Sequence, residues 1–150
     1  MPRITTLART GEVPASVEQI RDLVASTDGY TQINPFRTSD PKLVVTPFGP
    51  ASGAGAGFRF AGKDGKGTQT VDTVSVDGVS YAVDMGALGR STQSIRARRI
   101  DDARSEVTWT MQMDAGANPI RRVFGLHAGR FLAPVLETGV HNLATHTWTR

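Results

Sequence analysis

One histidine near the end of the chain stands in a mostly apolar helical pattern, where it could act on a bound molecule. Apolar residues recur around His127 at three- and four-residue steps, at Ile120, Val123, Phe124, Phe131 and Val135. Because this spacing gathers side chains on one face of a helix, we expect His127 to face the interior. An imidazole there can hydrogen-bond a ligand oxygen or transfer a proton, with Tyr81 and Asp84 as candidate partners. The alternative is a buried histidine with one structural hydrogen bond.

The other groupings that could do chemistry are incomplete. Glu137 and His141 lie four residues apart, but the further ligands of a zinc site are not evident, so we expect a surface ion pair. Residues 57–64 approach a phosphate-binding loop, yet Asp64 replaces the magnesium-binding hydroxyl and puts negative charge near the phosphates. The chain contains no cysteine, which excludes thiolate catalysis and cysteine-bound metals. We therefore expect no metal and no cofactor.

The element that must position His127 is a long C-terminal helix over residues 118–147. Asn118 provides a capping side chain, and Pro119 is tolerated at the first helical position because its missing N–H costs nothing there. Interior glycines each cost about 1 kcal/mol relative to alanine, and Pro134 predicts a kink. A helix this poor in intrinsic propensity needs a surface to lie on.

That surface is predicted by the preceding residues, whose apolar pattern changes to a period of two. Between residues 42 and 114 this alternation predicts about six antiparallel strands joined by tight turns, with one face covered. The inward residues of strands and helix form either a close-packed core or the wall of a ligand cavity. The expected wall residues are Phe58, Phe60, Tyr81, Val83, Met85, Trp109, Met111, Met113, Phe124, His127, Phe131 and Val135. Adaptable methionines and a glycine-rich covering helix favour the cavity.

The N-terminal region is expected to contain one strand and two short helices. Residues 3–13 alternate modestly, as in a strand. Ser16 and Gln19 have the spacing of a capping box at the start of a helix, which Asp28-Gly29 ends. A second helical turn is expected from Tyr30 to Pro35, closed by the proline.

Length and composition indicate one globular domain over residues 1–150, with 39% hydrophobic and 21% charged residues. No signal-like run and no stretch of roughly 18 apolar residues is present, so a soluble cytoplasmic protein without membrane insertion is expected. A net charge of +3 does not by itself predict nucleic-acid binding. The densest basic group mixes Arg96, Arg98, Arg99 and Arg104 with Asp101, Asp102 and Glu106. It indicates a solvated strand face or, alternatively, a patch for an anionic partner. The oligomeric state is left open.

Several short segments carry a family resemblance over nearly the whole chain. They are residues 13–17, 55–60, 107–109, 132–134 and 137–143. With the order of elements, they make the sequence similar to START-like (SRPBCC) proteins, particularly the polyketide cyclase/dehydrase and lipid-transport superfamily. The resemblance implies an α+β helix-grip fold. In that fold, a curved antiparallel sheet of about six to seven strands wraps around a long C-terminal α-helix, and two short helices follow the first strand. It also implies a hydrophobic cavity for lipids, sterols, polyketides or hormones, but no shared catalytic signature.

Three functional hypotheses follow. The first is binding of a small hydrophobic ligand (lipid, sterol or polyketide-like) between the sheet and the C-terminal helix, with His127 and Tyr81 orienting it. The second is a polyketide cyclase or dehydratase in the same cavity, with His127 transferring a proton. The third is a protein- or RNA-interaction module using the arginine-bearing strand face. The first requires only the fold and an unfilled interior.

Overall fold

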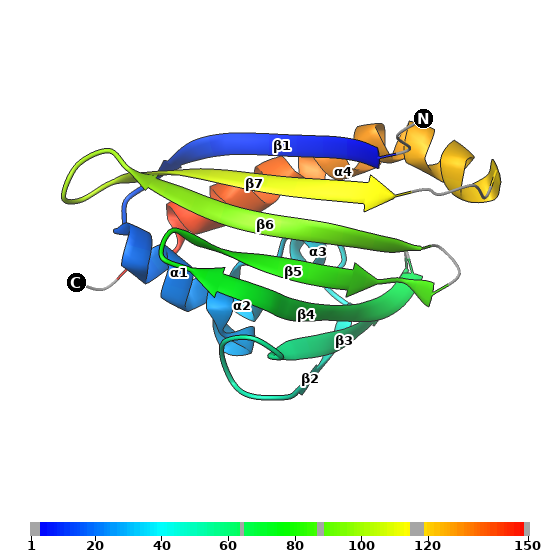
Figure 1. Cartoon of the computed structure of the whole chain (residues 1–150), viewed down its shortest axis with the longest axis horizontal. Coiled ribbons are helices and arrows are strands. Elements are labelled where there is room, and N and C mark those ends of the chain that lie inside the picture. The colour runs from blue at the N-terminus through cyan, green and yellow to red at the C-terminus, as the bar shows by residue number, and fades with distance from the viewer. Residues whose placement is uncertain (1–3, 64, 87–88, 115–118, 149–150) are drawn as a thin grey trace.

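The computed structural model describes residues 4–63, 65–86, 89–114 and 119–148; for Ile4, Asp114 and residues 119–131 it describes the backbone only. In this part of the chain, a seven-stranded antiparallel sheet has the order β1-β7-β6-β5-β4-β3-β2 (Figure 1). The strands are β1 (Ile4–Val13), β2 (Val44–Phe48), β3 (Gly57–Gly62), β4 (Gly65–Ser75), β5 (Gly78–Asp84), β6 (Arg90–Arg99) and β7 (Ser105–Asp114). The predicted helix-grip fold is confirmed.

Helices cover one face of this sheet, which we call the inner face. They are α1 (Val17–Ala25), α2 (Thr27–Ile33), α3 (Pro35–Ser39) and α4 (Pro119–Thr145). Helix α1 packs on β4, β5 and β6, whereas α4 runs behind β1 and β7 and contacts α3 (Figure 1). No helix in the described part of the chain has the length and apolar character needed to cross a bilayer.

The start of α1 confirms the predicted capping box. The Ser16 hydroxyl accepts a hydrogen bond from the Gln19 backbone N–H at 3.1 Å, and Gln19 Oε1 accepts one from the Ser16 N–H at 2.9 Å. These bonds satisfy two backbone donors that the first turn of a helix leaves free. The local sequence therefore fixes where the chain turns from β1 into α1.

Pro35 has a different role from the one predicted, and a second proline lies inside a strand. Pro35 does not close a helix; it occupies the first position of α3, capped by Asn34 Oδ1, which accepts from the Phe36 N–H at 3.0 Å. The structure thus has a third short helix. Pro47 lies within β2, which in the described sheet is an edge strand beside β3. An edge strand tolerates proline because one of its sides needs no N–H donor.

The second half of α4 is fastened to β1 and to the short helices. Arg9 Nε lies 3.0 Å from Glu137 Oε1, which links β1 to α4. Asn142 Nδ2 donates to the Ile33 carbonyl and to Thr38 Oγ1, each at 3.1 Å. These contacts hold the C-terminal part of α4 in a fixed position over the sheet.

Candidate ligand-binding site

Burial divides the predicted wall residues that the structure describes into two groups. Six are buried: Phe58, Tyr81, Val83, Trp109, Met111 and Val135. Three are only partly buried: Phe60, Met85 and Met113. The side chains of Phe124, His127 and Phe131 lie outside the described residues, so their predicted places in the wall stay predictions.

The buried group is centred on Trp109, which α4 covers closely. The indole is fully buried, and a Cβ placed on Gly139 would lie 2.4 Å from its Cζ3 atom. Gly11 of β1 similarly approaches Val140, whose Cγ1 would be 2.6 Å from an added Cβ. Such distances are below van der Waals contact, so no side chain fits between helix and sheet here. This end of the interior is a packed core and not a cavity.

The partly buried group is spread over β3, the end of β5 and the end of β7, at positions away from Trp109. Phe60 of β3 is paired with Gly67 of β4. The next residue of β4, Thr68, is paired with Asp84 of β5, and Met85 follows Asp84 in the chain. Met113 lies at the far end of β7, two inward positions beyond Trp109. Large apolar side chains that remain partly exposed on an inner face leave surface for a hydrophobic molecule to cover.

A buried polar network crosses the inner face between these two groups. Trp109 Nε1 donates to Gln93 Oε1 at 2.9 Å, and Gln93 Nε2 donates to Gln69 Oε1 at 2.9 Å. Gln69 is 4% exposed, yet its Nε2 is the one buried side-chain nitrogen or oxygen found without a hydrogen-bond partner in the described part of the molecule. Buried polar atoms nearly always have a partner, so this donor requires an explanation.

The indole fixes the direction of the whole network. An indole N–H can only donate, so the amide atom of Gln93 that faces it must be the oxygen. The Gln93 NH₂ group then faces Gln69, whose facing atom must in turn be the oxygen. The amide orientations are therefore set by the donor at Trp109 and do not have to be assumed. The free group at the end is necessarily an N–H donor.

Two tyrosines complete this region. Tyr30 of α2 packs its ring 5.3 Å from that of Tyr81 and 6.0 Å from Trp109, and its hydroxyl lies 3.5 Å from Gln93 Oε1. Burial raises the pKa of Tyr30 well above its usual range, an effect that the neighbouring amides of Gln69 and Gln93 only partly offset. Burial, followed by the nearby Tyr30, also raises the pKa of Tyr81. Both hydroxyls thus stay protonated at neutral pH.

The hydroxyl of Tyr81 already donates a hydrogen bond within the protein. It donates to the Val24 carbonyl at 2.5 Å and so ties β5 to α1. This bond uses the donor of the hydroxyl and leaves its oxygen able to accept, so the predicted ligand-orienting role of Tyr81 stays a prediction. Asp84, the other candidate partner of His127, forms an ion pair with Arg90 at 3.4 Å and accepts from the Gly86 N–H.

A small cavity adjoins the free amide. Its volume is about 10 Å³, roughly that of one water-sized group. It is lined by Val24, Ser26, Thr27, Tyr30, Ala56, Gly57, Phe58, Gln69, Val71 and Tyr81. None of these side chains is charged at neutral pH, so the cavity suits a neutral group.

Tyr30, Gln69 and Gln93 were not among the predicted site residues. Gln69 and Gln93 stand among threonines and serines, where glutamine is typical of a solvated strand face. A possible signal was their alternation with Val71 and Ile95 on the same strands. Tyr30 lies in a seven-residue helix with no clear apolar repeat, so its inward position depends on how α2 docks.

The predicted ion pair between Glu137 and His141 is wrong, because Glu137 pairs with Arg9 of β1. Among the described residues, no group of three or more potential metal ligands comes together.

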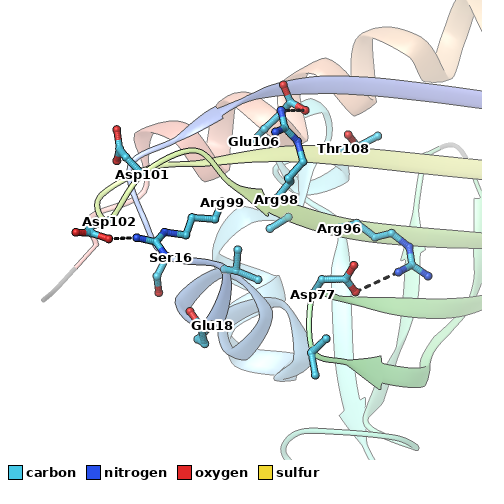
Figure 2. A pocket seen from close by; sticks show the side chains of 13 residues that line it. Ser16, Glu18, Asp77, Arg96, Arg98, Arg99, Asp101, Asp102, Glu106 and Thr108 are labelled. Carbon is cyan, nitrogen blue, oxygen red and sulfur yellow. Dashed lines mark hydrogen bonds and ion pairs between the residues drawn. The ribbon is translucent and has the colours of Figure 1, made fainter.

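The arginine-bearing strand face borders an outer groove of about 800 Å³ (Figure 2). Its lining contains five carboxylates and three guanidinium groups. Arg96 lies 3.2 Å from Asp77, Arg98 lies 3.2 Å from Glu106, and Arg99 pairs with Asp102. Because each of these arginines faces a carboxylate, little positive charge is left for an anionic partner.

Comparison with known proteins identifies the family. The model of the family described as polyketide cyclase / dehydrase and lipid transport matches residues 5–147. The chain belongs to this family. No curated protein matches it in sequence. In this member of the polyketide cyclase/dehydrase and lipid-transport family, the Gln69 amide on the inner face has an N–H donor without a hydrogen-bond partner among the described residues.

Solved structures with the same fold are similar to this family member at low sequence identity. The KanY protein superimposes with a TM-score of 0.70 at 14% identity, covering 95% of this chain and 96% of that one. Norcoclaurine synthase from Thalictrum flavum, solved with dopamine and hydroxybenzaldehyde, gives 0.66 at 12% identity, with coverages of 97% and 90%. Ara h 8.0201 gives 0.62 at 9% identity, with coverages of 93% and 97%. At these identities the likeness establishes the fold alone.

Proposed function

We propose that this protein binds a small hydrophobic molecule (a lipid, a sterol or a polyketide-like compound) between the inner face of the sheet and α4. The observation that carries the proposal is that Phe60 and Met113 pack against the core yet stay only partly buried, while the interior around Trp109 is fully packed. Apolar side chains left partly exposed beside a core can line a ligand site. A hydrophobic ligand would cover them.

The family supports binding more directly than any particular reaction. Its description names both cyclase/dehydrase and lipid-transport members. In the described interior, the titratable groups near the cavity are two tyrosines whose raised pKa keeps them neutral, so they would not serve as bases near pH 7. Proton transfer by His127 stays a separate prediction, which turnover of a polyketide substrate by a His127→Ala variant would contradict.

Native mass spectrometry of freshly purified protein, compared with its denatured mass, tests the proposal first. We expect a non-covalent adduct that survives desalting, and its mass would distinguish a lipid from a sterol or a polyketide. A clean mass, together with no binding of the neutral fluorescent probe N-phenyl-1-naphthylamine, would argue for a filled core and against ligand binding.

A charged substitution tests whether Met113 belongs to the wall of the ligand site. Met113→Glu should weaken binding of the probe at least tenfold, because the ligand would have to cover a carboxylate. Val44→Glu is the matched control, since Val44 lies on the edge strand β2 and is 60% exposed. Equal affinities of the two variants would remove Met113 from the site.

The cytoplasmic location and the absence of a nucleic-acid partner belong to the same proposal. The paired charges of the arginine-bearing face support the second expectation. Binding to RNA with a steep salt dependence would contradict it.

A further inference from the structure

We infer that the free Nε2 of Gln69 is the polar recognition group of the ligand site, and that it donates a hydrogen bond to an oxygen of a neutral, carbonyl-bearing hydrophobic molecule. This inference rests on the proposed function, because it specifies which class of hydrophobic molecule the interior takes. It concerns a residue that neither the sequence pattern nor the family description indicates.

The first support is the fixed polarity of the amide network. Trp109 Nε1–H faces Gln93 Oε1, and Gln93 Nε2 faces Gln69 Oε1. Turning either amide over would bring two donors or two acceptors together. The Tyr30 hydroxyl lines the same cavity, and the Gln69 amide partly offsets the burial that raises its pKa, but it does not reach hydrogen-bond geometry with Nε2. The network is therefore completed by a further group that accepts a hydrogen bond. An alkane or an ammonium group does not meet this requirement, whereas a carbonyl oxygen does.

The second support is the place of Gln69 between the packed and the partly exposed halves of the inner face. It is paired with Phe58 on β3 and with Val83 on β5. The next inward residue of β4 is Gly67, against which the Phe60 ring packs, 3.0 Å from the position of an added Cβ. Gln69 thus adjoins the position of Phe60, one of the partly exposed wall residues, whereas the cavity beside its amide is lined by Phe58. The ligand body would lie at Phe60, and its polar end would pass Phe58 to reach the amide.

The third support is the size and the neutrality of the cavity beside Gln69. A volume of about 10 Å³ accepts one oxygen-sized group and not a bulky one. Its lining includes the hydroxyl-bearing Tyr30 and Thr27 but no cationic side chain. A carboxylate placed here would be buried without a counter-charge, which is strongly unfavourable. A ketone, aldehyde, ester or lactone oxygen fits both conditions.

The test uses three ten-carbon probes that differ only in their polar end: 2-decanone, decane and decanoate. Each displaces N-phenyl-1-naphthylamine from the full-length protein, and its apparent affinity is measured for the wild type and for Gln69→Met. Methionine keeps the length of the side chain and removes the amide donor. Gln112→Met is the matched control, because Gln112 lies on the same sheet but is exposed on β7.

We expect Gln69→Met to weaken the binding of 2-decanone about tenfold, the loss typical of one buried hydrogen bond. The affinity for decane should change less than twofold. Gln112→Met should change neither. Equal weakening of ketone and alkane by Gln69→Met would show that Gln69 acts only in packing and would overturn the inference. Tighter binding of decanoate than of 2-decanone to the wild type would overturn the neutral ligand class.

A measurement on the wild type tests the inference even if Gln69→Met does not fold. The carbonyl ¹³C resonance of labelled 2-decanone should lie downfield of its position in hexane when the ketone is bound, because a hydrogen bond polarises the carbonyl. A resonance at the hexane position would overturn the inference, since the amide would then be satisfied by a buried water. If the fluorescent probe and all three displacing probes fail to bind, the proposed function itself fails.

Discussion

Replacing Gly139 by alanine should raise helix propensity but also create a steric overlap, and the structure predicts that the overlap has the larger effect on stability. In the interior of a helix, alanine is more favourable than glycine by about 1 kcal/mol. The new Cβ, however, would lie 2.4, 2.7 and 2.9 Å from three atoms of the Trp109 ring. The indole is fully buried and holds a hydrogen bond to Gln93, so it cannot move without cost. Overpacking of this kind costs about 1–3 kcal/mol.

We therefore expect Gly139→Ala to lower the free energy of unfolding by about 1 kcal/mol, or Tm by roughly 3 °C for a domain of this size. Urea unfolding followed by far-UV circular dichroism measures this change without depending on tryptophan emission. In the Trp109→Phe background, which removes the outer ring atoms, the same glycine substitution should become neutral or stabilising. An increase in stability of about 1 kcal/mol in the wild-type background would refute the close helix–sheet contact.

Two further predictions concern the short helices and the buried phenols. Ser16→Ala removes the hydroxyl that accepts from Gln19 at the start of α1, and should cost about 1 kcal/mol in urea unfolding; no loss would contradict the capping box. The chain has two tyrosines, and burial raises the pKa of both above 10.0. In the unfolded chain they ionise near pH 10, whereas in the fold they resist ionisation, so stability is kept below pH 10 and falls as pH rises above it. Phenolate absorbance at high pH should therefore appear only as the circular dichroism signal is lost, and an earlier appearance would show accessible hydroxyls.

The strands and the long helix could be predicted because their signals are local. Alternation from Val79 to Met85 and from Val107 to Met113 corresponds to β5 and β7, and the Ser16–Gln19 spacing is a property of four consecutive residues. Pro35 shows the limit of such reasoning, since a proline can end one helix or begin the next. Only the docking of Asn34 as a cap decides between them.

Gln69 was hard to find because a bulge changes the phase of β4. The alternation of Val74 and Val76 on this strand suggests that its even-numbered residues face inward. The register shifts between Val71 and Thr73, so that the odd-numbered residues before the bulge face the interior instead. A one-residue change of phase exchanges every inward side chain for an outward one. The alternation of the valines in the second half of β4 therefore does not extend to Gln69 in the first half.

The link between Trp109 and Gln69 also gives the molecule a built-in optical probe. Indole emission depends on the polarity around the ring and on the hydrogen bond of its N–H, and here that bond leads through one amide to the group proposed to meet the ligand. The chain contains a second tryptophan, Trp148, which lies near the C-terminus and donates to the Leu143 carbonyl. With Trp148 replaced by phenylalanine, the remaining emission would come from the centre of the interior. Occupancy of the site could then be followed in real time without attaching a dye.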